Sequence, residues 1–177
     1  MHYISHYQSP MGEILLAADE IGLTGLWFEG QKYFALYLDK EHKKKELPLF
    51  EQTKKWLDIY FSGKEPNFDV PLHFIGTDFQ NEVWKILYSI PYGQTMTYGE
   101  IAKRFAANHG LKRMSAQAVG GAVGRNEISI IVPCHRVVGT NGSLTGYAGG
   151  IDKKMALLKL EGAWKKEYFV PKHSTAP

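Results

Sequence analysis

A turn-rich stretch at residues 63–71 limits most strongly what this chain can fold into. It holds a glycine, two prolines, an asparagine and an aspartate, which favour turns over helices and strands. Before it, short apolar segments separated by turn residues indicate strands, and after it apolar residues recur at helical spacing. We therefore expect a strand-rich N-terminal domain over residues 1–75, a mostly helical C-terminal domain over 76–170 and a polar tail over 171–177.

The N-terminal domain is expected to be a small antiparallel sheet with one helix. Three segments predict the strands of a meander: residues 3–8, 13–18 and 23–28. The charged run at residues 40–46 is interpreted as a solvated loop or helix face, with a nucleic-acid patch as the less favoured alternative. Pro48 suits the first turn of a helix, and apolar residues follow it at helical spacing as far as Phe61.

Capping residues mark the helices of the C-terminal domain. Thr77 and Thr97 each stand three residues before a glutamine or glutamate, which is the pattern of a capping box. Ser115 predicts a further helix start, and Asp152 is expected to cap the last helix, which ends near Glu161. The two short helices after Thr97 and Ser115 are joined by a loop with two basic residues, so they are a helix-turn-helix candidate. The fold class expected is α+β.

The second of these short helices, residues 116–123, is rich in glycine and alanine. A glycine inside a helix costs on the order of 1 kcal/mol relative to alanine, so a helix that keeps several must gain from the missing side chains. Tight packing on a neighbouring helix and close approach to another surface explain this equally well. If that surface is DNA, the helix would bind it by shape with little sequence preference, because it lacks long side chains to contact bases.

Composition excludes several classes of protein. No apolar run reaches the roughly 18 residues that span a membrane, and the first residues lack the pattern of a signal peptide. The single cysteine, Cys134, allows neither an internal disulfide nor a multi-cysteine zinc site, which fits a reducing cytoplasm. We expect a cytoplasmic protein with no metal or cofactor. The net charge of +3 permits nucleic-acid binding without indicating it.

Cys134 has His135 and Arg136 as its next neighbours in the sequence. Most free cysteines are buried and inert, and that is the ordinary alternative here. Nearby cations, however, favour the thiolate, which is the nucleophilic form. In an extended chain His135 points away from the sulfur, so contact through a water is expected unless the chain turns there. Glu161 is a candidate acceptor for the imidazole, although the residues alone favour an exposed carboxylate at a helix end.

The segment Pro133-Cys134-His135-Arg136-Val137 resembles the active-site motif of the O6-alkylguanine-DNA alkyltransferases, also called methylated-DNA–protein-cysteine methyltransferases. The similarity also includes residues 118–122, Asn126, 146–150 and 157–162, and it covers about residues 77–162. It implies a ribonuclease H-like N-terminal domain and a winged-helix-like helix-turn-helix in the C-terminal domain. It also implies irreversible, single-turnover transfer of a methyl or larger alkyl group to Cys134 from O6 of guanine, and from O4 of thymine. The nucleotide would first be flipped out of the duplex.

The resemblance implies catalytic roles by position. Cys134 would be the nucleophile, His135 would take its proton through a water, and Glu161 would hold His135. Tyr98 would crowd the phosphate of the target nucleotide and donate a proton to the guanine ring. Asn126 would brace the turn behind the active site.

Further positions would hold the DNA or support the site. Four residues in or next to the small helix would contact the minor groove: Ala118, Gly120, Gly121 and Arg125. The backbone of Val137 and Ala148, together with that of Cys134, would hydrogen-bond the extruded base, and Tyr147 would wall the alkyl pocket. Three residues would be structural: Pro133, Arg136 and Asp152. Of these, Asp152 is expected to be the partner of Arg136.

The sequence departs from the family pattern at two positions. Gln117 stands where many relatives have an arginine that fills the gap left by the flipped base, so weaker stabilisation of the extruded state is expected. Glu127 stands where many relatives have proline, which bears on the rigidity of the loop. The implied partner is duplex DNA containing O6-alkylguanine, bound by a monomer from the minor-groove side with little sequence specificity.

Three other interpretations compete with this one. A damage-binding protein without transfer activity, like the alkyltransferase-like proteins, typically has tryptophan in place of the cysteine, so Cys134 opposes it. A cysteine hydrolase would need an oxyanion hole, and a redox enzyme would usually need a resolving cysteine. A base-reading regulator would need longer side chains than the small helix provides. The alkyltransferase is the favoured interpretation.

Overall fold

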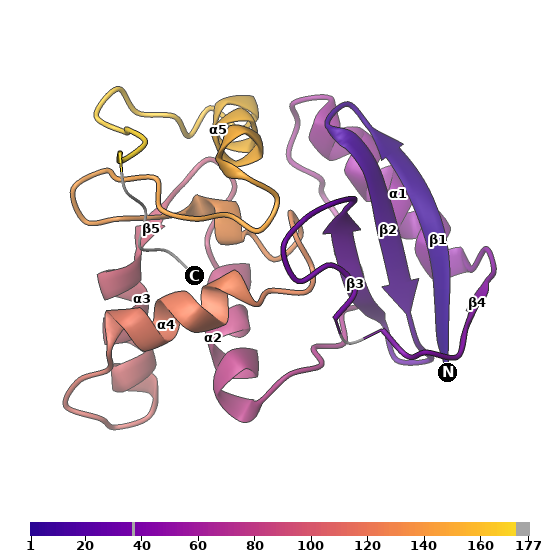
Figure 1. The fold of residues 1–177 in the computed structure, drawn as a ribbon, viewed down its shortest axis with the longest axis horizontal. Helices are drawn as coiled ribbons and strands as arrows, with labels where there is room; N and C mark the ends of the chain where they lie inside the picture. Colours follow the sequence, from indigo (N-terminus) through magenta and orange to yellow (C-terminus); the bar gives the residue numbers. More distant parts are fainter. Residues whose placement is uncertain (37, 173–177) are drawn as a thin grey trace. The chain divides into compact units, whose positions relative to one another are not determined.

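The described residues of the computed structural model divide into two compact units (Figure 1). The described residues are 1–36 and 38–172. The N-terminal unit contains residues 1–75 together with 127–129, and the C-terminal unit contains residues 76–126 and 130 onward. Strands dominate the first unit and helices the second, which confirms the predicted α+β class.

The sheet of the N-terminal unit contains the predicted meander and one further strand. Strands β1 (His2–Ser9), β2 (Gly12–Ala18) and β3 (Leu23–Phe28) pair antiparallel in chain order. Strand β4 (His42–Lys44) pairs parallel with β1, so the order is β3-β2-β1-β4. The predicted loop or helix face at residues 40–46 was therefore wrong at these three positions. Every side chain of β4 is exposed, so this edge strand has no apolar alternation that could have predicted it.

The core of this unit lies around β2 and β3. Helix α1 (Pro48–Phe61) begins at the predicted proline, packs against β1 and β2, and buries Tyr60 completely. A separate cluster packs Leu15 and Trp27 against loop residues that include Phe34. Strand β3 is buried along its whole length.

The N-terminal unit also takes in a piece of chain from much later in the sequence. Leu26 in β3 forms an isolated parallel bridge with Ile128. The N–H of Leu26 donates to the carbonyl of Glu127 at 2.9 Å, and the N–H of Ser129 donates to the carbonyl of Leu26 at 3.0 Å. Residues 127–129 therefore extend the sheet beside β3 just before the chain reaches the cysteine segment.

Three helices of the C-terminal unit begin where the capping residues predicted. They are α2 (Asp78–Tyr88), α3 (Tyr98–Asn108) and α4 (Ala116–Gly124). Each follows a hydroxyl side chain that accepts a backbone N–H of the first turn: Thr77, Thr97 and Ser115. Thr77 forms the full capping box with Gln80. Caps act over two or three residues, so these starts depend on local sequence alone.

Helices α2, α3 and α4 pack against one another and form the helical layer of this unit (Figure 1). The indole N–H of Trp84 in α2 donates to the carbonyl of Ala122 in α4 at 2.9 Å. Helices α3 and α4 are the predicted helix-turn-helix pair. The short strand β5 (Met96–Thr97) before α3 pairs parallel with β6 (Val137–Val138), which follows the cysteine.

The last helix, α5 (Ile151–Leu160), differs from the prediction at its start. Gly150 occupies the N-cap position with φ of 98°, a conformation that glycine adopts readily, and Asp152 lies in the first turn. The prediction that Asp152 caps this helix was therefore wrong. Most of the predicted tail, residues 171–177, lies outside the described residues. Within the described chain no helix has the length and apolar character needed to cross a bilayer.

Candidate active site

The chain turns sharply at the cysteine. Pro133 has φ of −84° and ψ of 65°, and the N–H of Cys134 donates to the carbonyl of Val132 at 2.8 Å, which together define an inverse γ-turn. Residues Cys134–Arg136 then form a short 3-10 helix that leads into β6. This segment is therefore not extended. The side chains of Cys134, His135 and Arg136 point in different directions around a 3-10 turn instead of alternating between two faces.

The sulfur of Cys134 is buried and receives a hydrogen bond. The side-chain amide of Asn126 donates to Sγ at 3.2 Å and to the carbonyl of Val132 at 2.8 Å. Burial raises the pKa of the thiol, whereas the bond from Asn126 and the positive charge of Lys154 act to lower it. Asn126 therefore both braces the turn and favours the reactive thiolate.

Glu161 lies between the two basic neighbours of the cysteine. His135 Nε2 lies 2.5 Å from Glu161 Oε2, and Arg136 Nε donates to Oε1 at 2.7 Å. The N–H of Gly93 also donates to Oε1, at 3.1 Å. The expectation that Asp152 pairs with Arg136 was wrong, because Glu161 at the end of α5 takes that place. Glu161 is also buried rather than exposed.

This buried cluster fixes the protonation of its members. Burial acts to raise the pKa of Glu161, but the hydrogen bonds from His135 and Arg136 and the charge of the Arg136 guanidinium lower it to about 2. The carboxylate is therefore ionised and accepts a hydrogen bond from His135, which must carry its hydrogen on Nε2. Burial also lowers the pKa of His135, against the opposing effect of Glu161, so the imidazole is neutral at rest. A neutral imidazole held by a carboxylate is able to accept a proton at Nδ1.

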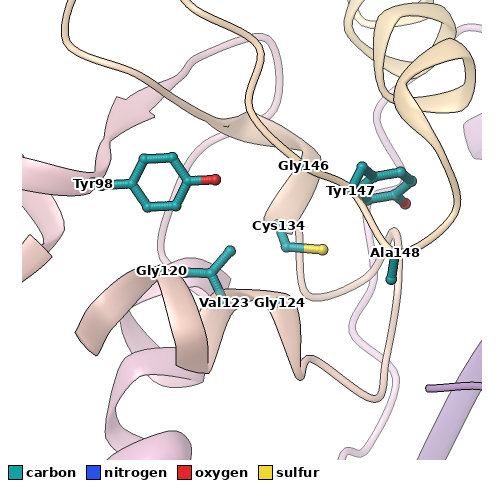
Figure 2. Close-up of a pocket in the computed structure, with 8 residues that line it drawn as sticks. All are labelled: Tyr98, Gly120, Val123, Gly124, Cys134, Gly146, Tyr147 and Ala148. Carbon is teal, nitrogen blue, oxygen red and sulfur yellow. The ribbon is translucent and has the colours of Figure 1, made fainter. Parts of the chain in front are cut away.

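A small pocket leads to the sulfur. Figure 2 shows Cys134 between Tyr98 of α3 on one side and the loop with Tyr147 and Ala148 on the other. The hydroxyl of Tyr98 donates to the carbonyl of Thr145 in that loop at 3.2 Å. The remaining lining residues come from α4 and the loop: Gly120, Val123, Gly124 and Gly146. The pocket therefore brings together, around the thiol, residues that are far apart in sequence.

Other predicted residues lie on α4 or support the pocket. Gln117 and Ala118 are exposed, Gly121 is partly exposed, and Arg125 forms the C-cap. Among the described residues, nothing lies within 4 Å of where a Cβ on Gly121 would stand. Packing on a neighbouring helix therefore does not explain this glycine. Val137 is buried, and its carbonyl accepts a bond from Lys154 at 2.6 Å.

Family models match both units. Residues 78–163 match the DNA-binding domain of 6-O-methylguanine DNA methyltransferases, and residues 2–74 match their ribonuclease-like domain. The chain belongs to the 6-O-methylguanine DNA methyltransferase family. The resemblance seen in the sequence is thereby confirmed.

Relatives of this methyltransferase family match over nearly the whole chain. A methylated-DNA–protein-cysteine methyltransferase of Methanosarcina acetivorans is 48% identical over 169 residues, covering 91% of this chain and 99% of the relative. The corresponding protein of Haemophilus influenzae is 41% identical, and the match covers 90% of this chain and 86% of the relative. The structure of Mycobacterium tuberculosis O6-methylguanine methyltransferase aligns with a TM-score of 0.77 at 44% identity, covering 92% and 94%. A structure of that organism's protein in complex with DNA aligns with a TM-score of 0.78 at 43% identity, and the match covers 91% of this chain and 93% of that structure's chain.

The sequence did not point to one buried residue beside the candidate site. Lys154 of α5 is fully buried, and its ammonium donates to the carbonyls of Val137, Thr145 and Gly146 at 2.6, 3.2 and 3.3 Å. Burial lowers its pKa to about 8. The signal that could have found it is its spacing, because Lys154 lies three and four residues before the apolar Leu157 and Leu158, on the buried face of α5.

We expect Lys154→Met to make the thiol less reactive. The buried ammonium favours the thiolate of Cys134 through its charge, and methionine fills a similar volume without that charge. Carbamidomethylation of Cys134 by iodoacetamide at neutral pH should slow about fivefold, and its pH profile should move to higher pH. Lys159→Met, on the exposed face of the same helix, is the control. Equal rates in the two variants would show that the charge of Lys154 does not act on the sulfur.

Proposed function

We propose that this protein repairs DNA by direct reversal, transferring the methyl group from O6 of guanine to Cys134. The observation that carries the proposal is the only thiol of the chain, buried at the base of a pocket and backed by Asn126 and the His135–Glu161 pair. The sulfur attacks the methyl carbon, the carbon–oxygen bond breaks, and guanine leaves. The thioether is stable, so each molecule acts once.

The proton transfers follow from the arrangement of the site. His135 takes the proton of the thiol, through a water and at Nδ1, because its Nε2 faces Glu161. Glu161 stabilises the imidazolium that forms. Burial raises the pKa of Tyr98, so its hydroxyl is neutral and able to give a proton to the departing guanine ring. Asn126 supports the sulfur while it carries negative charge.

DNA is held from the minor-groove side. Ala118 is exposed and Gly121 is partly exposed on α4, and these small residues permit close backbone approach, while the buried Gly120 leaves room beside Tyr98. Because these side chains are too short to contact bases specifically, binding has little sequence preference. Gln117 fills the gap left by the flipped nucleotide less well than a guanidinium would, and Arg125 contacts the phosphates. The backbone of Val137 and Ala148 bonds the extruded base, and Tyr147 walls the alkyl group.

Three further properties belong to the proposal. The protein acts as a monomer. It also accepts a methyl group from O4 of thymine. A free thiol that must stay reduced fits the cytoplasm.

The first experiment measures the intact mass of the protein after mixing with excess duplex DNA that contains O6-methylguanine. We expect the mass of one methyl group to be added, mapped to Cys134 by peptide analysis, and never more than one per chain. Unmodified duplex of the same sequence is the control. An unchanged mass, with the protein folded and the thiol reduced, would contradict the proposal.

A further inference from the structure

The piece of chain just before the cysteine segment is anchored in the N-terminal unit. Trp27 and Glu127 are almost fully buried, at 2% and 3% exposure, and the indole N–H of Trp27 donates to Glu127 Oε2 at 2.8 Å. The backbone bonds of Leu26 with Glu127 and Ser129 hold the same segment to β3. A buried carboxylate is costly unless it is hydrogen-bonded, so the tryptophan bond fixes where Glu127 lies.

This anchored segment lies next to the catalytic residues in the chain. Asn126, which donates to the sulfur of Cys134, directly precedes Glu127. On the other side, Ile130 is fully buried and has φ of 72°, a conformation that β-branched residues rarely adopt. Such a conformation persists only where the surrounding structure enforces it. The segment is therefore held firmly at both ends as it enters and leaves the sheet.

We infer that the Trp27–Glu127 hydrogen bond positions Asn126 so that its amide reaches the sulfur of Cys134. Both are positioning residues, because neither touches the thiol and both act through Asn126. The peptide bond between Asn126 and Glu127 fixes the start of the asparagine side chain, and the asparagine bonds to Val132 and Cys134 close the loop. This inference rests on the proposed function for its link to methyl transfer.

The test uses variants on both sides of the bond. Trp27→Phe removes the N–H donor and keeps an aromatic ring, and Glu127→Met removes the acceptor and keeps the side-chain length. Glu127→Gln retains an amide oxygen that accepts from the indole, so it is the conservative rescue. Trp56→Phe, a half-buried tryptophan of α1 stacked on Tyr60, is the matched control in the same unit.

Two quantities are measured for each folded variant. Single-turnover methyl transfer gives the maximal rate and the DNA concentration for half-maximal rate. Carbamidomethylation by iodoacetamide across pH gives the thiol pKa without DNA. We expect Trp27→Phe and Glu127→Met to lower the maximal rate about tenfold, to leave the half-saturating DNA concentration unchanged, and to move the thiol profile to higher pH. Glu127→Gln should restore most of the rate.

Several results would overturn the inference. The first is a Trp27→Phe variant that matches Trp56→Phe in both measurements. The second is a Trp27→Phe or Glu127→Met variant in which only the DNA affinity changes. The third is a Glu127→Gln variant that transfers methyl as slowly as Glu127→Met. If the wild-type protein transfers no methyl group, the proposed function fails. The iodoacetamide profile then still decides whether the pair acts on the thiol. If one variant fails to fold, the variant on the other side of the bond carries the test.

Discussion

Replacing Cys134 with alanine should abolish methyl transfer and leave DNA binding largely intact. Alanine has no electron pair to attack the methyl carbon, and the chain holds no other thiol to replace it. The residues expected to contact the minor groove lie on α4 or directly after it, so the loss of one buried sulfur atom leaves that surface unchanged. Intact mass after incubation with O6-methylguanine duplex measures transfer, and fluorescence anisotropy of the same labelled duplex measures binding.

A second substitution, Cys134→Ser, tests whether the reaction needs sulfur itself as the nucleophile. Cys134→Ser keeps an oxygen near the position of the sulfur, but a hydroxyl ionises far less readily than a thiol and is a much weaker nucleophile under these conditions. It should therefore be as inactive as Cys134→Ala. Persistent methylation of either variant would show that another residue accepts the group. Lost DNA binding in both would show that the cysteine supports the structure rather than the reaction.

Replacing Glu161 with glutamine should both slow transfer and destabilise the fold. The carboxylate accepts bonds from His135, Arg136 and Gly93, and it is the buried charge that balances the guanidinium. Glutamine keeps one acceptor but places an NH2 group against a donor. Removing one partner of a buried ion pair costs about 3–5 kcal/mol, so a clear fall in the free energy of unfolding is expected. The remaining folded protein should transfer methyl slowly, because the imidazolium loses its counter-charge.

The pH dependence of the free energy of unfolding separates the loss of the Glu161 charge from a general disturbance of packing by the substitution. Glu161 has a folded pKa of about 2 against an ordinary value of 4.5, so it stabilises the fold above pH 4.5 and this stability is lost as pH falls toward 2. The difference corresponds to about 3 kcal/mol at neutral pH. Urea unfolding of the wild type between pH 5 and 3 should show this loss, and Glu161→Gln should show a flatter profile. Glu167→Gln, an exposed carboxylate, is the control and should follow the wild type.

Local chemistry explains which parts of the fold could be predicted from the sequence. The caps at Thr77, Thr97 and Ser115 placed three helix starts correctly, because each cap bonds within its own first turn. Strand β4 escaped prediction because its side chains are exposed and its pairing with β1 is a long-range contact. At α5 a glycine conformation, rather than the nearby Asp152, sets the start of the helix.

The candidate site also contains parts that the local sequence predicts and parts that only the fold reveals. The neighbours of Cys134 are visible as a motif, but the sequence does not say which carboxylate meets them. Asp152 was the predicted partner of Arg136, yet the fold brings the end of α5 to it, so Glu161 accepts hydrogen bonds from both His135 and Arg136. Lys154 escaped notice because a lysine in a helix is ordinarily solvated, and only the fold shows its burial. The bond between Trp27 and Glu127 joins residues 100 positions apart, and no local pattern indicates it.

A protein that reacts once and is not regenerated is wasted by every stray reaction of its thiol. Cys134 exposes only 6% of its surface, at the base of a pocket walled by two tyrosines. Burial also keeps the pKa of the thiol raised, so the resting molecule carries the less reactive protonated form. Bulky electrophiles and oxidised thiols in the surrounding solution therefore consume it slowly. Burial therefore lowers the intrinsic reactivity of the thiol but lengthens the time for which it stays unmodified. Molecules made long before a lesion arises still have a free thiol when they meet it.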